Sequence, residues 1–211
     1  MARLKQSYMT GEGTGQLLYE TIGTCFDRVA TQHPGNPALI VCHQGIRWSY
    51  QELRRQVDRL ATGLIALGIR PGDRIGIWGP NSYEWVVTQF ATAKIGAILV
   101  NVNPAYRLFE LEYVLNKVGC KAIIAAEKFK SSEYLNMLNS LAPEISSCEP
   151  GYLRSDKLPH LTTVIRMGDQ RSPGMFNFEE VCTLGESEQY DRLRELAKEL
   201  GPDDAINIQF T

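Results

Sequence analysis

The sequence lacks the features that mark membrane-spanning and nucleic-acid-binding proteins. No apolar run approaches the ~18 residues that a membrane span needs. Lysine and arginine number 22 against 24 aspartate and glutamate, which gives a net charge of -2 and no basic surface for nucleic acid. We therefore expect neither a membrane span nor a nucleic-acid partner.

Motifs of several enzyme classes are also missing. The chain has no GxxxxGK(S/T) phosphate loop and no GxSxG nucleophile elbow. Its five cysteines form no CxxC pair and its three histidines form no HxxxH pair, so a reducing compartment fits better than a zinc or disulfide framework. Asp203 and Asp204 could hold Mg²⁺, but a turn explains this pair more simply. Cys25 and Cys120 are interpreted as buried apolar residues rather than nucleophiles.

The first twenty residues show no regular pattern. Arg3 and Lys5 supply positive charge, but the apolar segment of a secretory signal does not follow them. Residues 11–15 (GEGTG) resemble a glycine-rich loop only superficially, because no strand precedes them. We expect a poorly ordered segment over residues 1–20 and a globular domain over 21–211, in a chain with 44% apolar and 22% charged residues.

The clearest pattern covers residues 73–126. Apolar strands are predicted over 73–78, 97–102 and 121–126, and each pair is separated by a helix of about ten residues. The first helix begins after Asn81 or Ser82 and ends at Gly96, and the second ends at Gly119. Strands alternating with helices predict an α/β fold, with a parallel sheet and flanking helices.

The flanking segments give weaker patterns. Residues 38–43 and 46–49 predict a hairpin, and Ser49 with Glu52 predicts a capping box that opens a helix over 49–67. Downstream we expect an irregular surface excursion over 142–160, a strand over 162–167, an exposed charged helix over 186–200 and an edge strand over 205–210.

Few side chains stand out as ligands. Trp85, Phe90 and Tyr113 occupy helical positions and are predicted to be core residues. Asn103, Pro104 and Tyr106 follow a strand, so they form either a loop facing a binding cleft or an ordinary turn, and turn chemistry favours the second. The residues by themselves indicate a scaffold without recognisable chemistry.

Three stretches, taken in order, resemble the adenylate-forming enzymes, a family that includes acyl-CoA synthetases, 4-coumarate-CoA ligases and luciferases. They are WSYQEL at residues 48–53, GDRIGIWGPNS at 72–82 and GAILVNVNP at 96–104. Further stretches, among them WGPNSYEWV, ELEYVLNKVGCKA and INIQFT, are similar to the mitochondrial medium-chain acyl-CoA synthetases, over nearly the whole chain. The resemblance implies the N-terminal part of the large α/β domain of such an enzyme.

The resemblance also implies an activity for the full-length protein. Such enzymes join a medium-chain fatty acid to coenzyme A, using ATP and Mg²⁺. The fatty-acid carboxylate attacks the α-phosphate to give an acyl-adenylate and pyrophosphate, and the coenzyme A thiol then attacks the acyl carbon. A mitochondrial location is implied, with a cytoplasmic one as the alternative because no transit peptide is visible. The oligomeric state is left open.

The same resemblance aligns Thr211 with the first residue of the family's phosphate-binding loop, TSGTTGxPKG. The rest of that loop and the lid with its catalytic lysine follow this position in the family. We therefore expect no catalytic residue, no metal site and no tightly bound cofactor in this chain. We interpret the chain as the product of a truncated or incomplete gene model or of a short splice variant. The alternatives are a non-catalytic interaction or regulatory fragment of the same family, and an unrelated nucleotide-binding module, which the missing phosphate loop disfavours.

Overall fold

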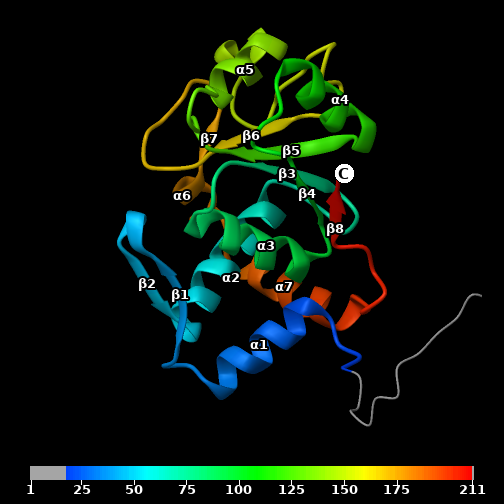
Figure 1. The fold of residues 1–211 in the computed structure, drawn as a ribbon. Helices are drawn as coiled ribbons and strands as arrows, with labels where there is room; N and C mark the ends of the chain where they lie inside the picture. Colours follow the sequence, from blue (N-terminus) through cyan, green and yellow to red (C-terminus); the bar gives the residue numbers. More distant parts are fainter. Residues whose placement is uncertain (1–17, 211) are drawn as a thin grey trace, which may run out of the picture.

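The computed structural model describes residues 18–210 and contains a six-stranded sheet in which every neighbouring pair of strands is parallel (Figure 1). In their order across the sheet the strands are β7 (Phe176–Asn177), β6 (Thr163–Arg166), β5 (Cys120–Ala125), β3 (Arg74–Trp78), β4 (Ile98–Asn101) and β8 (Asn207–Gln209). This topology confirms the predicted α/β class.

Helices cover both faces of the sheet (Figure 1). Helices α2 (Tyr50–Ala66), α3 (Tyr83–Ile95) and α7 (Ser187–Glu199) lie on one face, and α4 (Leu108–Val118) and α5 (Tyr134–Leu141) lie on the other. Alternate residues of each strand point to opposite faces, so their side chains contribute to two separate hydrophobic cores. The α3-side core includes Leu60, Leu64, Ile75, Ile77, Leu99 and Leu196. The α4-side core includes Trp78, Val100, Leu111, Leu115, Ile123 and Tyr134.

The segment from β3 to β5 contains residues that begin and end its helices at the predicted places. The Ser82 hydroxyl accepts a hydrogen bond from the Trp85 backbone and begins α3. Gly96 and Gly119 end α3 and α4 with φ angles of 70° and 62°, a left-handed region that glycine enters without the Cβ clash of other residues. The predicted boundaries are confirmed to within two residues.

The segment before the sheet also follows the prediction. Strands β1 (Pro37–Val41) and β2 (Ile46–Ser49) form an antiparallel hairpin around the short 3₁₀ helix η1 (Cys42–Gln44). Ser49 and Glu52 form the predicted capping box at the start of α2. Gln44 anchors the hairpin to the first turn of α3, because its amide accepts from the Tyr83 backbone at 2.8 Å and donates to Glu84 at 2.9 Å.

Helix α1 (Ile22–Gln32) packs outside α2 and α3 and is linked to them by ion pairs. The buried Lys94 of α3 places its Nζ 2.8 Å from an Asp27 oxygen of α1 and 2.5 Å from an Asp58 oxygen of α2. Burial raises the pKa of Asp58 despite its attraction to Lys94. One ammonium group therefore links three helices.

Two predictions about the later chain are wrong in part. Residues 142–160 do not form a purely surface excursion, because Ile145 of the 3₁₀ helix η2 (Pro143–Ser147), Leu153 and Leu158 are buried in the α4-side core. Helix α7 is charged as predicted but is not simply exposed, since Leu193 and Leu196 enter the α3-side core. Strand β7, helix α5 and the short helix α6 (Phe178–Val181) were not anticipated.

Within residues 18–210, no helix combines the length and apolar character needed to cross a bilayer.

Candidate functional site

The carboxyl edge of the sheet contains a topological switch point. Strand β3 continues into α3 on one face, whereas the adjacent β4 continues into α4 on the other face (Figure 1). The strand order reverses at β3, since the chain passes to β4 on one side of it and then to β5 on the other, and in open parallel sheets ligands bind outside the carboxyl ends of the strands at such a point. Residues 79–82 and 102–107 form the loops after β3 and β4 and define the candidate site.

The second loop is held in a fixed turn. The Asn103 side chain accepts a hydrogen bond from the Ala105 backbone at 2.9 Å, and the Asn103 carbonyl accepts from the Tyr106 backbone at 3.0 Å. The indole Nε1 of Trp78, the last residue of β3, donates to the same carbonyl at 3.1 Å. Asn103 therefore acts through its turn and a cross-strand bond, as the turn interpretation predicts.

Tyr134 of α5 supports this loop from beneath. Its ring lies 4.0 Å from that of Trp78 between centroids, and its hydroxyl donates to the Pro104 carbonyl at 2.8 Å. Burial raises the pKa of Tyr134, so the phenol remains a hydrogen-bond donor at neutral pH. Tyr106 is half-buried against the same α4-side core. The loop between β4 and α4 is thus preorganised by its own Asn103 turn and by Trp78 and Tyr134 from neighbouring elements.

A buried cation also lies near this edge, at the end of β6. Arg166 donates to Glu127 at 2.9 Å, to Gln170 at 3.0 Å and to Ser172 at 2.7 Å. The Glu127 carboxylate already neutralises the charge of Arg166, and the three hydrogen bonds direct its guanidinium to groups of the protein itself. Arg166 is therefore not arranged as a phosphate ligand.

The family-like residues at the other edge have a structural role. At the amino end of the sheet, Asp73 accepts from the Arg70 backbone at 2.9 Å and from Lys121 at 2.7 Å. Arg74 donates to the carbonyls of Val118 and Gly119, at 2.6 and 3.0 Å. In the sequence, residues 72–74 and 119–121 stand out only as parts of the family resemblance. A signal for their role was present, because GDR leads into one predicted strand and GCK into another. In a parallel sheet the starts of both strands lie at the same edge.

The remaining predicted positions are Thr211 and the aspartate pair Asp203 and Asp204. Thr211, the nucleotide-binding position implied by the resemblance, lies outside the described residues. Asp203 accepts from the Tyr19 hydroxyl at 2.7 Å and Asp204 from the Gly201 backbone at 2.8 Å, which supports the turn interpretation. In residues 18–210, no group of three or more His, Cys, Asp or Glu side chains is placed to hold a metal ion.

The aromatic and thiol predictions have mixed outcomes. Trp85 and Phe90 pack against the α3-side core as predicted. Tyr113 is not a core residue: it is 53% exposed, on the outer face of α4. Cys120 is buried, whereas Cys25 is only half-buried.

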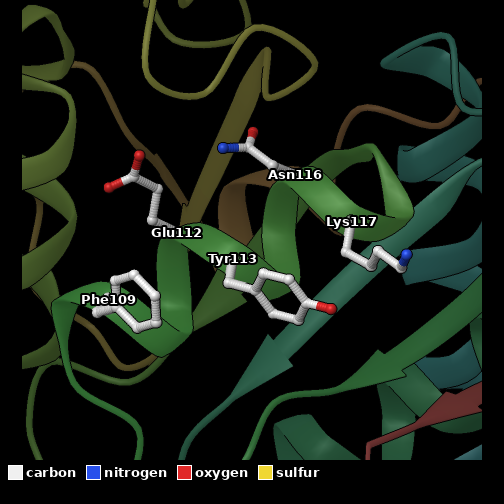
Figure 2. A pocket seen from close by; sticks show the side chains of 5 residues that line it. All are labelled: Phe109, Glu112, Tyr113, Asn116 and Lys117. Atoms are coloured by element: carbon white, nitrogen blue, oxygen red, sulfur yellow. The ribbon is translucent and has the colours of Figure 1, made fainter.

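One hollow lies away from the carboxyl-edge loops. It measures about 450 Å³ and is lined by five residues of α4 (Figure 2). It shares no lining residue with the loops between β3 and α3 or between β4 and α4. The candidate site is defined by strand topology instead, because every side chain that lines this hollow belongs to one helix and no second element contributes polar groups to it.

Comparison with known proteins agrees with this architecture. Residues 26–211 match the family described as AMP-binding enzyme. The chain is 47% identical to the bovine mitochondrial medium-chain acyl-CoA ligase ACSF2 over 206 residues, which cover 97% of this chain and 33% of the bovine protein. It is 44% identical to the Danio rerio protein of the same name over 99% of this chain and 34% of that protein.

Solved structures show the same fold. The anthranilate CoA ligase AuaEII in complex with anthranoyl-AMP superposes with a TM-score of 0.67 at 21% identity, over 81% of this chain and 29% of that one. A Mycobacterium tuberculosis fatty acyl CoA synthetase gives a TM-score of 0.63 at 21% identity, over 90% of this chain and 32% of that one. The chain spans about a third of the length of the curated relatives it matches. With its sequence matched over most of its length, the chain belongs to the AMP-binding enzyme family.

Proposed function

We propose that this chain is the N-terminal portion of a medium-chain fatty acid–CoA ligase. The full-length protein would convert ATP, a medium-chain fatty acid and coenzyme A into acyl-CoA, AMP and pyrophosphate through an acyl-adenylate. The observation that carries this proposal is the 47% identity to a medium-chain acyl-CoA ligase across 97% of the chain. The same relatives support a mitochondrial location.

We further propose that residues 21–211 form part of the large nucleotide-binding domain and have no activity alone. The reaction needs donors aimed at the charge that develops on the transferred group. Among the described residues near the carboxyl edge, Arg166 is committed to Glu127, Gln170 and Ser172, and no metal-binding cluster is present. Arg166 is therefore not available to bind the phosphates of ATP. Thr211 is proposed as the first residue of the phosphate-binding loop in the full-length protein.

Two proteins test the proposal. One is the 211-residue chain, and the other is a chimera that joins this chain to the part of the bovine ligase following its matched segment. The chimera should catalyse ATP–pyrophosphate exchange with octanoate, and more efficiently than with acetate or palmitate. The 211-residue chain should give no exchange above a no-enzyme control. A folded chimera without exchange would count against the ligase assignment, and exchange by the chain alone would refute its inactivity.

A further inference from the structure

Helix α4 carries aromatic side chains on the face that points away from the core. Phe109 is 80% exposed and Tyr113 is 53% exposed, and they lie four residues apart, so that they neighbour each other on the helix surface. Figure 2 shows Phe109, Tyr113 and Lys117 following one another along the helix, with Glu112 and Asn116 beside them. Together with the 41% exposed Leu108, these residues form what we call the α4 outer face.

This face differs from that of an ordinary surface helix. The inner side of α4 already buries Leu111, Val114 and Leu115, so the helix is apolar on two sides. A helix that covers a sheet and faces water normally has a polar outer side. Helix α7 is such a helix within this chain, since its exposed residues are mainly charged: Glu188, Asp191, Arg194, Glu195 and Lys198. The α4 outer face is therefore suited to a contact.

The path of the chain indicates which partner lies nearest. Strand β8 pairs with β4, the strand that leads into α4. Ile208 and Phe210 pack against the α4-side core, so the described chain reaches residue 210 on the same side of the sheet as α4. About two thirds of the length of the curated relatives lies outside the matched segment. A polypeptide continuing from residue 210 therefore starts on the α4 side of the sheet, opposite the face that α2 and α7 cover.

We propose that the α4 outer face is an intramolecular docking surface for the remaining part of the full-length ligase. This inference rests on the proposed function, which supplies the longer protein. The docking segment would place apolar side chains over Phe109 and Tyr113. A basic side chain would lie near Glu112 and an acidic one near Lys117, since these two charges flank the rings.

Site-resolved cysteine labelling tests the proposal. Phe109→Cys and Tyr113→Cys are introduced separately into the 211-residue chain and into the chimera, and maleimide incorporation is followed by peptide mass spectrometry. The exposed native Cys42, on the hairpin away from α4, provides the control in every sample. We expect labelling at positions 109 and 113 to be at least ~10-fold slower in the chimera than in the chain, because burial in an interface restricts access to local opening. Labelling of Cys42 should be unchanged.

The outcomes separate this inference from the proposed function. Equal labelling at 109 and 113 in a chimera that catalyses octanoate-dependent exchange would overturn the docking surface and leave the ligase assignment intact. Protection in an inactive chimera would support the docking surface and weaken the assignment. Protection already present in the 211-residue chain, with a dimer that Phe109→Glu converts to a monomer, would overturn the proposal in favour of self-association.

Discussion

The guanidinium of Arg74 donates through Nε to the main-chain carbonyl of Val118 at 2.6 Å. This bond and its neighbour to Gly119 satisfy carbonyls at the carboxyl end of α4, where the helix has no internal donors left. The start of one strand thus caps the helix that leads into the next strand. A residue of the GDR stretch acts on the stability of the sheet rather than on a ligand.

Replacing Arg74 should therefore destabilise the fold. We expect Arg74→Ala to lower the free energy of unfolding by about 2–4 kcal/mol, because charge-assisted bonds to partly buried carbonyls are lost. Urea denaturation followed by circular dichroism measures the change. Arg55→Ala, at an exposed position of α2, is the matched control and should stay within about 0.5 kcal/mol of the parent. Equal effects of the two substitutions would contradict the capping role.

The Tyr134 hydroxyl should contribute measurably to the loop between β4 and α4. Tyr134→Phe removes its 2.8 Å bond to the Pro104 carbonyl while keeping the ring packed against that of Trp78. We expect a loss of about 1–2 kcal/mol in unfolding free energy. Tyr152→Phe, at a side chain that is 73% exposed, controls for the loss of a hydroxyl. If the two variants are equally stable, the bond does not support the loop.

The buried thiol of Cys120 predicts a loss of stability at alkaline pH. Burial raises the pKa of Cys120 from 9.0 to about 12. Its folded form holds the proton while the unfolded form loses it, so the stabilising contribution is complete below about pH 9 and declines as pH rises toward 12. The slope attributable to this thiol should be about 1.4 kcal/mol per pH unit in that window.

Comparing two cysteine variants isolates this effect. Unfolding free energies measured under reducing conditions from pH 8 to about 11 should fall less steeply for Cys120→Ala than for the parent chain. Cys42→Ala, which removes an exposed thiol, should retain the slope of the parent. Parallel curves for all three proteins would argue against a buried, protonated Cys120.

Gly63 lies where α2 approaches the backbone of α6. A Cβ at this position would sit 1.9 Å from the Val181 carbonyl oxygen, which is backbone and not easily displaced. We expect Gly63→Ala to lower the unfolding free energy by about 3 kcal/mol, although alanine favours helices. Gly35→Ala has nothing within 4 Å of the new methyl group and should be nearly neutral. A stabilising effect of Gly63→Ala in thermal unfolding would rule out this close approach.

The parts of the fold that were predictable depend on local signals. The unit from β3 to β5 has apolar strands, a serine cap and glycine stops next to the residues they affect. Strand β7 has only two residues and exists because β6 is beside it, and no local pattern marks such a strand. Leu153 and Leu158 are buried by the way an irregular segment packs over α4 and α5, which composition does not encode.

The candidate site was less predictable than the fold. The turn role of Asn103 followed from its residue type, but the bond from Trp78 to the Asn103 carbonyl requires β3 and β4 to be adjacent. The sequence pattern alone could have predicted that Tyr113 is exposed. Leu111, Val114 and Leu115 define the inner side of α4, and at about 100° per residue Tyr113 falls outside it.

The pairing of β8 with β4 has a consequence for folding during synthesis. Strands β3, β4 and β5 leave the ribosome in succession and can pair at once, whereas the strand that completes the other side of β4 comes from the far end of the chain. Pairings of such large sequence separation form late, because a long loop must close first. The β4 edge therefore remains open while the intervening segments are made, and a chaperone that shields an unpaired strand would act on the nascent chain at this edge.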